Sequence, residues 1–144
     1  ATRATAEAGL SLQQLESSKF EPTCSLESVV ELSTQKAVAA VNAVYSIPKD
    51  LAVKLIGFGT QKAKGEVLGA FTAYLASGTV VYKVAGQTEL ERPDVAAFFN
   101  VPAMLKSGFQ VDVDLKDVPA GDYSVYLRSA SGSTCPTHHI IRIQ

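Results

Sequence analysis

Alternation of apolar and polar residues is the main structural signal along the second half of the chain. Residues 109–116 read Phe-Gln-Val-Asp-Val-Asp-Leu-Lys, so every apolar side chain falls on one face and every polar side chain on the other. A period of two is that of a β-strand with one buried face. The pattern predicts a strand here, with Phe109, Val111, Val113 and Leu115 in the core.

Further short segments predict strands, and turn residues separate them. These segments are residues 51–56, 67–75, 79–84, 123–127 and 139–143. Ser77-Gly78 predicts a hairpin, and residues 118–121 suit a type I turn, with Pro at the second position and Gly at the fourth. Short strands at regular spacing predict an all-β fold, an antiparallel β-sandwich of the immunoglobulin-like kind.

Two segments depart from the strand pattern. Residues 92–100 predict a short helix, because Pro93 suits the first helical position and Asp94 complements the positive helix end. Val101-Pro102 then ends it. Residues 34–44 are rich in alanine, which is typical of a helix, but their valines are equally typical of a strand. The sequence thus predicts one or two short helices in the sandwich.

The N-terminal residues lack a clear core pattern. Residues 1–22 are dominated by Ala, Thr, Glu and Gln, and Pro22 marks a boundary. We therefore expect a linker or N-terminal extension over residues 1–22 and a β-sandwich domain over residues 23–144. The start has no signal-peptide pattern, and no apolar run approaches the ~20 residues that span a bilayer.

Composition fits a single globular domain and disfavours one class of partner. The chain has 144 residues, of which 47% are hydrophobic and 19% charged, so it can bury a core. Thirteen basic residues against fourteen acidic ones give a net charge of −1. A nucleic-acid partner would require a concentrated basic face, so we expect none.

The two cysteines bear on the compartment. Cys24 and Cys135 are far apart and lack the paired spacing of a metal site. We expect a structural disulfide between Cys24 and Cys135, which would imply an oxidising compartment. The alternative is a pair of buried free thiols in a cytosolic protein.

No residue pattern predicts an active site, a metal or a cofactor. Asp112 and Asp114 share a strand face, but their alternation with valines is typical of a solvated face rather than a glycosidase pair. His138 and His139 are neighbours, so we expect their side chains on opposite faces of a strand, unable to hold one metal ion. Gly57-Phe58-Gly59 lacks the Lys and Ser/Thr of a phosphate loop.

Two charged residues flank the predicted helix start and allow two interpretations. Arg92 can bind a carboxylate or phosphate of a glycan, since its guanidinium forms paired hydrogen bonds. The structural interpretation is that Asp94 caps the helix while Arg92 pairs with a nearby acid or carbonyl, and we favour it. Tyr82 and Tyr126 can in principle stack on sugar rings, although half-buried sheet tyrosines are far more common.

Three segments, taken in order, carry a resemblance. They are residues 91–99 (Glu-Arg-Pro-Asp-Val-Ala-Ala-Phe-Phe), 107–109 (Ser-Gly-Phe) and 114–123, which ends in Val-Pro-Ala-Gly-Asp-Tyr. Together they resemble a β-sandwich domain at the extracytoplasmic end of polytopic bacterial membrane proteins similar to glycosyltransferases of surface glycan assembly. The similar part runs from residue 24 to 144. Thr34 stands where an Asn-Gly type of turn is expected, and Phe58 replaces an expected Trp.

The resemblance implies a function, a compartment and partners. It implies a non-catalytic accessory domain of a membrane-bound glycan-assembly protein, on the periplasmic or extracellular side of the cell envelope. Its expected partner is the membrane-embedded portion of its own protein, and a glycan is a further candidate. The alternative function is a free-standing carbohydrate-binding or adhesion domain.

Overall fold

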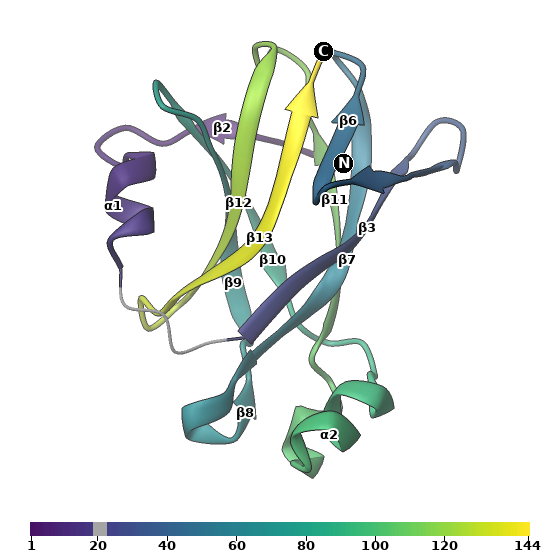
Figure 1. The fold of residues 1–144 in the computed structure, drawn as a ribbon, viewed down its shortest axis with the longest axis vertical. Coiled ribbons are helices and arrows are strands. Elements are labelled where there is room, and N and C mark those ends of the chain that lie inside the picture. Colours follow the sequence, from purple (N-terminus) through teal and green to yellow (C-terminus); the bar gives the residue numbers. More distant parts are fainter. Residues whose placement is uncertain (19–22) are drawn as a thin grey trace.

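Two β-sheets build the molecule, and the computed structural model describes residues 1–18 and 23–144 (Figure 1). One sheet has the order β1-β11-β7-β3-β4, with β8 also paired to β7. Its strands are β1 (Thr2–Arg3), β3 (Thr23–Glu31), β4 (Ala37–Val38), β7 (Ala52–Gln61), β8 (Glu66–Val67) and β11 (Gly108–Asp114). We call it sheet A.

The other sheet, sheet B, has the order β2-β10-β9-β12-β13-β6-β5. Its strands are β2 (Thr5–Ala6), β5 (Ala40–Val41), β6 (Val44–Ile47), β9 (Ala70–Ala76), β10 (Val81–Gln87), β12 (Gly121–Ser129) and β13 (Thr134–Ile143). Strands β1 and β11 pair in parallel, as do β6 and β13, and the other described pairs are antiparallel. The prediction of an all-β sandwich is confirmed, although the arrangement is not specifically immunoglobulin-like.

The core lies between the sheets, where the alternating segments predicted it. Phe109, Val111, Val113 and Leu115 are all buried, while Gln110 between them is exposed. The predicted hairpin is present as β9 and β10, which pair antiparallel from Val81↔Ala76 to Gln87↔Ala70. Period-two patterns therefore identified the buried faces correctly.

A tyrosine corner fixes the turn before β12. The Tyr123 hydroxyl donates to the Pro119 carbonyl oxygen at 2.8 Å, and Tyr123 is itself buried. Such a hydrogen bond to the backbone four residues upstream pins a loop between sandwich strands. The turn predicted from Pro119 and Gly121 thus gains a tertiary anchor.

In the described residues, two short α-helices and two 3₁₀ turns accompany the sheets. They are α1 (Leu12–Glu16), α2 (Pro93–Phe99), η1 (Lys62–Lys64) and η2 (Pro102–Met104). Helix α2 confirms the helix predicted over residues 92–100: Pro93 is at its first turn, and Asn100 ends it in the left-handed conformation at φ 55°.

Residues 34–44 form short strands joined by turns rather than a helix, which answers the question that their composition left open. Val38, Val41 and Val44 lie in β4, β5 and β6, and β5 pairs with β6 around a turn. Asn42 and Ala43 have φ values of 52° and 64°, which are typical of a tight type I′ hairpin. A helix over residues 34–44 would have removed β4, β5 and the Val44 end of β6, so strand pairing outweighs the helix propensity of the alanines.

The expectation that residues 1–22 form an extension outside the sandwich differs from the structure. Strand β1 pairs with β11 of sheet A, and β2 pairs with β10 of sheet B. Helix α1 follows, with a capping box in which Ser11 and Gln14 bond reciprocally. Its Leu15 is fully buried against Tyr74 and Tyr126 on the outer face of sheet B. The described part of this segment, residues 1–18, is therefore part of the fold, and the predicted boundary at Pro22 lies outside the described residues.

Candidate functional site

A cluster of charges lies where α2 begins. Arg92 is the N-cap residue, but its side chain makes no capping hydrogen bond. Its Nε and Nη2 donate to the two carboxylate oxygens of Asp94 at 3.0 and 2.8 Å. Its Nη1 and Nη2 also donate to the carboxylate of Glu27 on β3, the latter at 3.2 Å. One guanidinium therefore ties the helix start to sheet A.

The charges in this cluster stabilise one another. The Asp94 and Glu27 carboxylates raise the pKa of the Arg92 guanidinium, and Arg92 in turn lowers the pKa of Asp94 through its hydrogen bonds. The guanidinium carbon lies 5.5 Å from the centre of the Phe58 ring, within cation–π range. Arg92 thus pairs with nearby acids, as the structural interpretation expects, whereas Asp94 lies inside the first turn of α2 and accepts from Arg92 instead of occupying the N-cap position.

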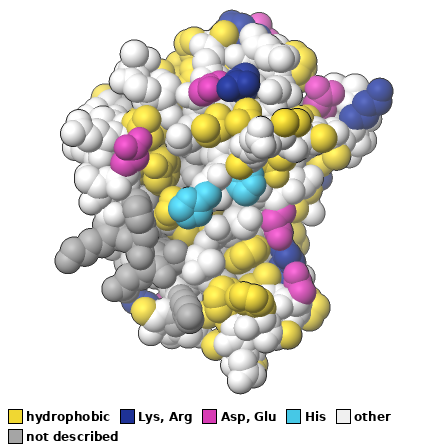
Figure 2. Space-filling model, in the orientation of Figure 1, with side chains coloured by type: hydrophobic (Ala, Val, Ile, Leu, Met, Phe, Trp, Pro, Cys, Tyr) yellow, Lys and Arg dark blue, Asp and Glu magenta, His cyan; other side chains and the backbone are white. Residues whose placement is uncertain are grey.

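An apolar pocket of about 390 Å³ adjoins this cluster. The residues that line it are Thr23, Glu27, Phe58, Arg92, Asp94, Val95, Phe98 and Phe99. In Figure 2, hydrophobic side chains gather at the lower end of the molecule, where α2 lies in Figure 1, beside side chains of both charges. The pocket combines an aromatic interior with a charged rim.

Phe98 is the most unusual residue of the pocket. Its side chain is 83% exposed, and it stands edge-on to Phe99 with ring centres 5.1 Å apart. The helix buries Val95 against the sandwich, and Phe99 lies four residues later on the same face. Phe98 is one position off that face, so the helix leaves it in solvent. A large exposed aromatic beside a pocket is typical of a binding surface.

Sequence reasoning found Arg92 and Asp94 but missed the aromatic half of the site. The helical period offers a signal. If Val95 faces the sandwich, then of the consecutive residues Phe98 and Phe99 only one can lie on the same face, and the other must be exposed. The contact with Glu27 had no such signal, because 65 residues separate it from Arg92. Phe58, noted as replacing a Trp, forms the wall of the pocket nearest to Arg92.

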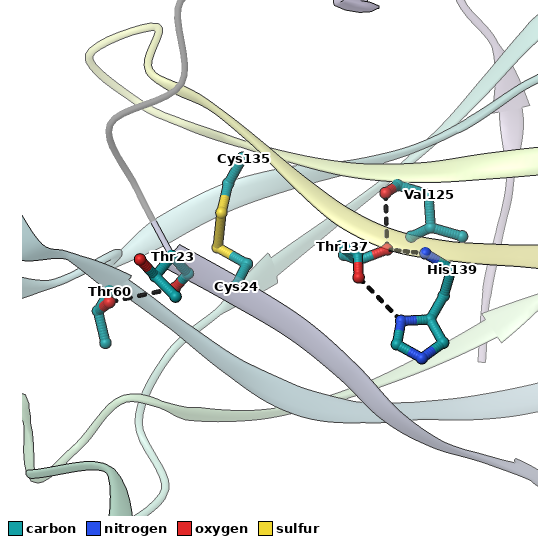
Figure 3. The surroundings of a disulfide bond; sticks show 7 residues. All are labelled: Thr23, Cys24, Thr60, Val125, Cys135, Thr137 and His139. Atoms are coloured by element: carbon teal, nitrogen blue, oxygen red, sulfur yellow. Dashed lines mark hydrogen bonds between the residues drawn. A yellow bond between two sulfur atoms is a disulfide. The ribbon is translucent and has the colours of Figure 1, made fainter. Parts of the chain in front are cut away.

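The predicted disulfide is present and joins the two sheets. Cys24 on β3 bonds to Cys135 on β13, with their Cα atoms 6.0 Å apart (Figure 3). Buried threonines flank it: Thr60 donates to the Thr23 carbonyl at 3.1 Å, and Thr137 donates to the Val125 carbonyl at 2.8 Å. A disulfide between buried cysteines fits a domain of an oxidising environment.

The two histidines share one face of the molecule, which corrects the expectation of opposite faces. Figure 2 shows both of them together, and His138 and His139 line one depression of about 260 Å³. The cause is an irregularity in the pairing of β12 and β13, where His138 has a φ of 61°. His139 Nδ1 lies 2.8 Å from the Thr137 carbonyl oxygen and therefore donates to it.

Other candidates have structural surroundings. Asp114 contacts Arg3 at 3.9 Å and accepts from the Lys116 amide, while Asp112 is exposed. Tyr126 is buried under α1, so it cannot stack on a sugar ring. Over the described residues, no group of three or more His, Cys, Asp or Glu side chains is placed to hold a metal ion. The same residues contain no helix long and apolar enough to cross a membrane.

Comparisons with known proteins add no relative. No protein-family model, curated protein or solved structure matches the chain. The functional argument therefore depends on the residues themselves.

Proposed function

We propose that the chain is a non-catalytic accessory domain of a membrane-bound glycan-assembly protein, on the extracytoplasmic side of the cell envelope. It docks on the rest of that protein through the α2 surface, by which we mean Phe58, Val95, Phe98 and Phe99. The observation that carries this proposal is the 83% exposure of Phe98 beside an apolar pocket. Exposed aromatics of this kind are costly to leave in water and act as anchors in interfaces.

The surroundings of the α2 surface support docking rather than chemistry. Arg92, which lines the pocket, donates its side-chain hydrogen bonds to the carboxylates of Glu27 and Asp94. A catalytic acid or base needs a proton to exchange with a substrate, whereas these carboxylates accept from a permanently charged group. The Cys24–Cys135 disulfide supports the extracytoplasmic compartment. The resemblance of residues 91–123 supports the class of parent protein.

A carbohydrate-binding domain is the second candidate, and one observation favours it. Phe98 and the Asp94 carboxylate, whose side chain is 66% exposed, lie together on the rim of the pocket. An aromatic face and a carboxylate are the groups that stack on a sugar ring and bind its hydroxyls. In that case the glycan itself occupies the pocket.

A surface substitution with a matched control tests the proposal. Phe98→Ser in the full-length protein should lower glycan assembly in membranes of the producing cell, because it removes the anchor. Val41→Ser is the control, since Val41 is also exposed, at 68%, but lies on β5. Neither change should alter the melting temperature of the domain.

The outcomes separate the two candidates. Full glycan assembly by the Phe98→Ser protein would overturn docking through the α2 surface. Amide shift changes at Phe98 and Phe99 when free oligosaccharides are added to the isolated chain would replace docking with direct glycan binding. Equal losses from both substitutions would show a general effect on the protein rather than an interface at α2.

A further inference from the structure

The N-terminal side of the sandwich is only half covered. Strand β1 pairs with β11 at Val113 and Asp114, and β2 pairs with β10 at Tyr82 and Lys83. Beyond these short strands β10 runs on to Gln87, and β11 runs back to Gly108, where Leu90 already pairs with its edge. Both sheets therefore present part of an edge strand on the same side of the molecule.

The backbone groups of β11 that face this edge can be identified from one hydrogen bond. The Ala4 amide donates to the Asp114 carbonyl at 2.9 Å, so Asp114 directs its backbone toward the edge. Backbone direction alternates along an antiparallel strand. Asp112 and Gln110 therefore direct their amides to the same edge. In the part of the chain that the structure describes, Gln110 pairs only with Ile56 of β7, on the other side.

The backbone groups of β10 that face this edge follow from another hydrogen bond. The Glu7 amide donates to the Val81 carbonyl at 2.8 Å, so odd-numbered residues of β10 face the edge. Ala85 and Gln87 lie beyond the last β2 pair, and their described strand partners are Thr72 and Ala70 of β9. Backbone groups of β10 and β11 that have no partner on this side among the described residues thus face one opening.

A groove of about 750 Å³ occupies this opening. Its walls are Ala85–Gln87 of β10 and Gln110–Asp112 of β11, and Ala1 and Thr2 lie at one end. Leu90, 38% exposed, adds an apolar side chain. At Gly86 an added Cβ would approach Val111 to 2.7 Å, so glycine lets β10 lie close to the other sheet here.

We propose that this groove binds an extended peptide segment of a partner protein, which adds to β11 as a parallel strand in line with β1. An exposed strand edge is a template for another strand, because main-chain hydrogen bonds supply most of the contact. The chain already closes the other half of the same edge in this way, with β1 parallel to β11. The proposal goes beyond the α2 surface and is independent of it.

Charge and shape indicate the chemistry of the partner segment. Glu89 and Asp112 bring two carboxylates to the groove against the single Lys54, so a basic side chain is favoured. Leu90 favours an apolar side chain at a neighbouring position. The partner segment is thus an extended peptide that alternates apolar and basic residues.

An engineered strand joined to the N-terminus tests the groove directly. Thr2 pairs with Val113 in parallel, so residues added before Ala1 would run opposite Val111 and Gln110. The Ala4 amide faces β11, so the amides two, four and six residues before it face β11 as well. The probe is the extension Thr-Val-Lys-Val-Thr, and the control is Thr-Val-Pro-Val-Pro, in which proline replaces the two residues whose amides would face β11. Tethering gives the probe a high effective concentration.

Amide hydrogen exchange of the whole chain is the measurement. We expect exchange at the Gln110 amide to slow at least tenfold with the valine extension and to stay unchanged with the proline extension. Unchanged exchange with both extensions would overturn the proposal. So would slow exchange of Gln110 and Ala85 in the unextended chain, because these amides would then already be paired.

A variant that removes one donor sharpens the test. Gln110→Pro deletes the amide that faces the groove, and proline is tolerated at such a position on an edge strand. We expect the valine extension to raise the melting temperature, because it adds main-chain hydrogen bonds to β11. Gln110→Pro should abolish this rise, whereas Gln110→Val should preserve it. Equal behaviour of the two variants would contradict strand addition at β11. Phe98→Ser should leave this assay unchanged even if docking at α2 fails.

Discussion

The two long sides of the sandwich are closed by different means. On one side, β3 and β13 are joined by the Cys24–Cys135 disulfide, and Tyr45 adds a hydrogen bond from its hydroxyl to the Leu26 carbonyl at 3.0 Å. On the other side, residues 2–6 cross from sheet A to sheet B as two strands of two residues each. A covalent bond closes the first side, and a few hydrogen bonds close the second.

The two sides also differ in the room that they leave for a partner. The cysteines are buried, with 7% and 0% of their surfaces exposed, so the disulfide side has little room for change. Among the described residues, the N-terminal side keeps backbone groups without a strand partner in an open groove. The covalent cross-link and the groove proposed for strand addition thus lie on opposite sides of one core.

Removal of the disulfide should have the largest effect. Cys24 and Cys135 are 111 residues apart, and a cross-link over so long a loop contributes up to about 4–5 kcal/mol by restricting the unfolded chain. We expect Cys24→Ser with Cys135→Ser to lower the free energy of unfolding by several kcal/mol. Urea unfolding of both proteins measures the difference.

Mass spectrometry checks the same bond without mutation. Protein made in an oxidising compartment should have no alkylatable thiol, and the tryptic peptides that contain Cys24 and Cys135 should be linked. Two free thiols in such a sample would contradict the cross-link and remove the support that it gives to the proposed extracytoplasmic location.

The contacts of helix α1 near the N-terminus should contribute less to the free energy of unfolding than the disulfide, but still a measurable amount. Leu15 of α1 is fully buried against Tyr74 and Tyr126. Leu15→Ala leaves a cavity at that contact, so we expect a loss of about 2–4 kcal/mol in the free energy of unfolding. The matched control is Gln13→Ala, since Gln13 is exposed on the same helix. A loss below 0.5 kcal/mol, on the order expected for surface changes, would show that α1 contributes little to the fold.

Most of the sandwich could be predicted from the sequence because its strands have a local signature. Residues 109–116 alternate in polarity, and one face is buried as expected. Helix α2 could be predicted equally well, since Pro93 marks its start. In both cases the deciding physics lies within a few consecutive residues.

The remainder depended on distant contacts or on very short elements. Strands of two residues, such as β1 and β2, have no measurable period, and only their partners β11 and β10 make them strands. The contact of Arg92 with Glu27 spans 65 residues. At His138, a local irregularity cancels the rule that neighbouring side chains point to opposite faces. Each of these features arises from tertiary structure.

The tyrosine corner predicts a smaller effect, and the sequence carries a signal for it in Pro-Ala-Gly-Asp-Tyr before β12. Tyr123→Phe removes the hydrogen bond to the Pro119 carbonyl but keeps the buried ring. We expect a loss of about 1 kcal/mol in the free energy of unfolding, typical of one such hydrogen bond. Tyr82→Phe is the control, because the Tyr82 hydroxyl makes no hydrogen bond to the described residues. The Tyr82 ring packs beside the Tyr123 ring, with ring centres 6.1 Å apart. Equal losses would show that the corner adds no stability.

The smallest effect concerns the charge cluster at α2, at the end of the sandwich between its two sides. Hydrogen bonds from Arg92 lower the pKa of Asp94 below its usual value of 3.8. A carboxyl whose pKa falls on folding stabilises the folded state above its unfolded pKa, and this contribution is lost as the pH drops through the folded pKa. The melting temperatures of the natural protein and of Asp94→Asn should therefore differ at pH 7 and converge below pH 3.8.

Asp122, whose pKa Arg142 lowers in the same way, changes equally in both proteins and cancels from the difference in melting temperature. Arg92→Lys should shrink that difference at pH 7, because a lysine cannot form the paired hydrogen bonds that Arg92 makes to Asp94. A difference that persists unchanged at pH 2 would mean that Asp94 acts through packing and not through its charge. In that event the α2 start would owe its position to the apolar contacts of Val95 rather than to the ion pair.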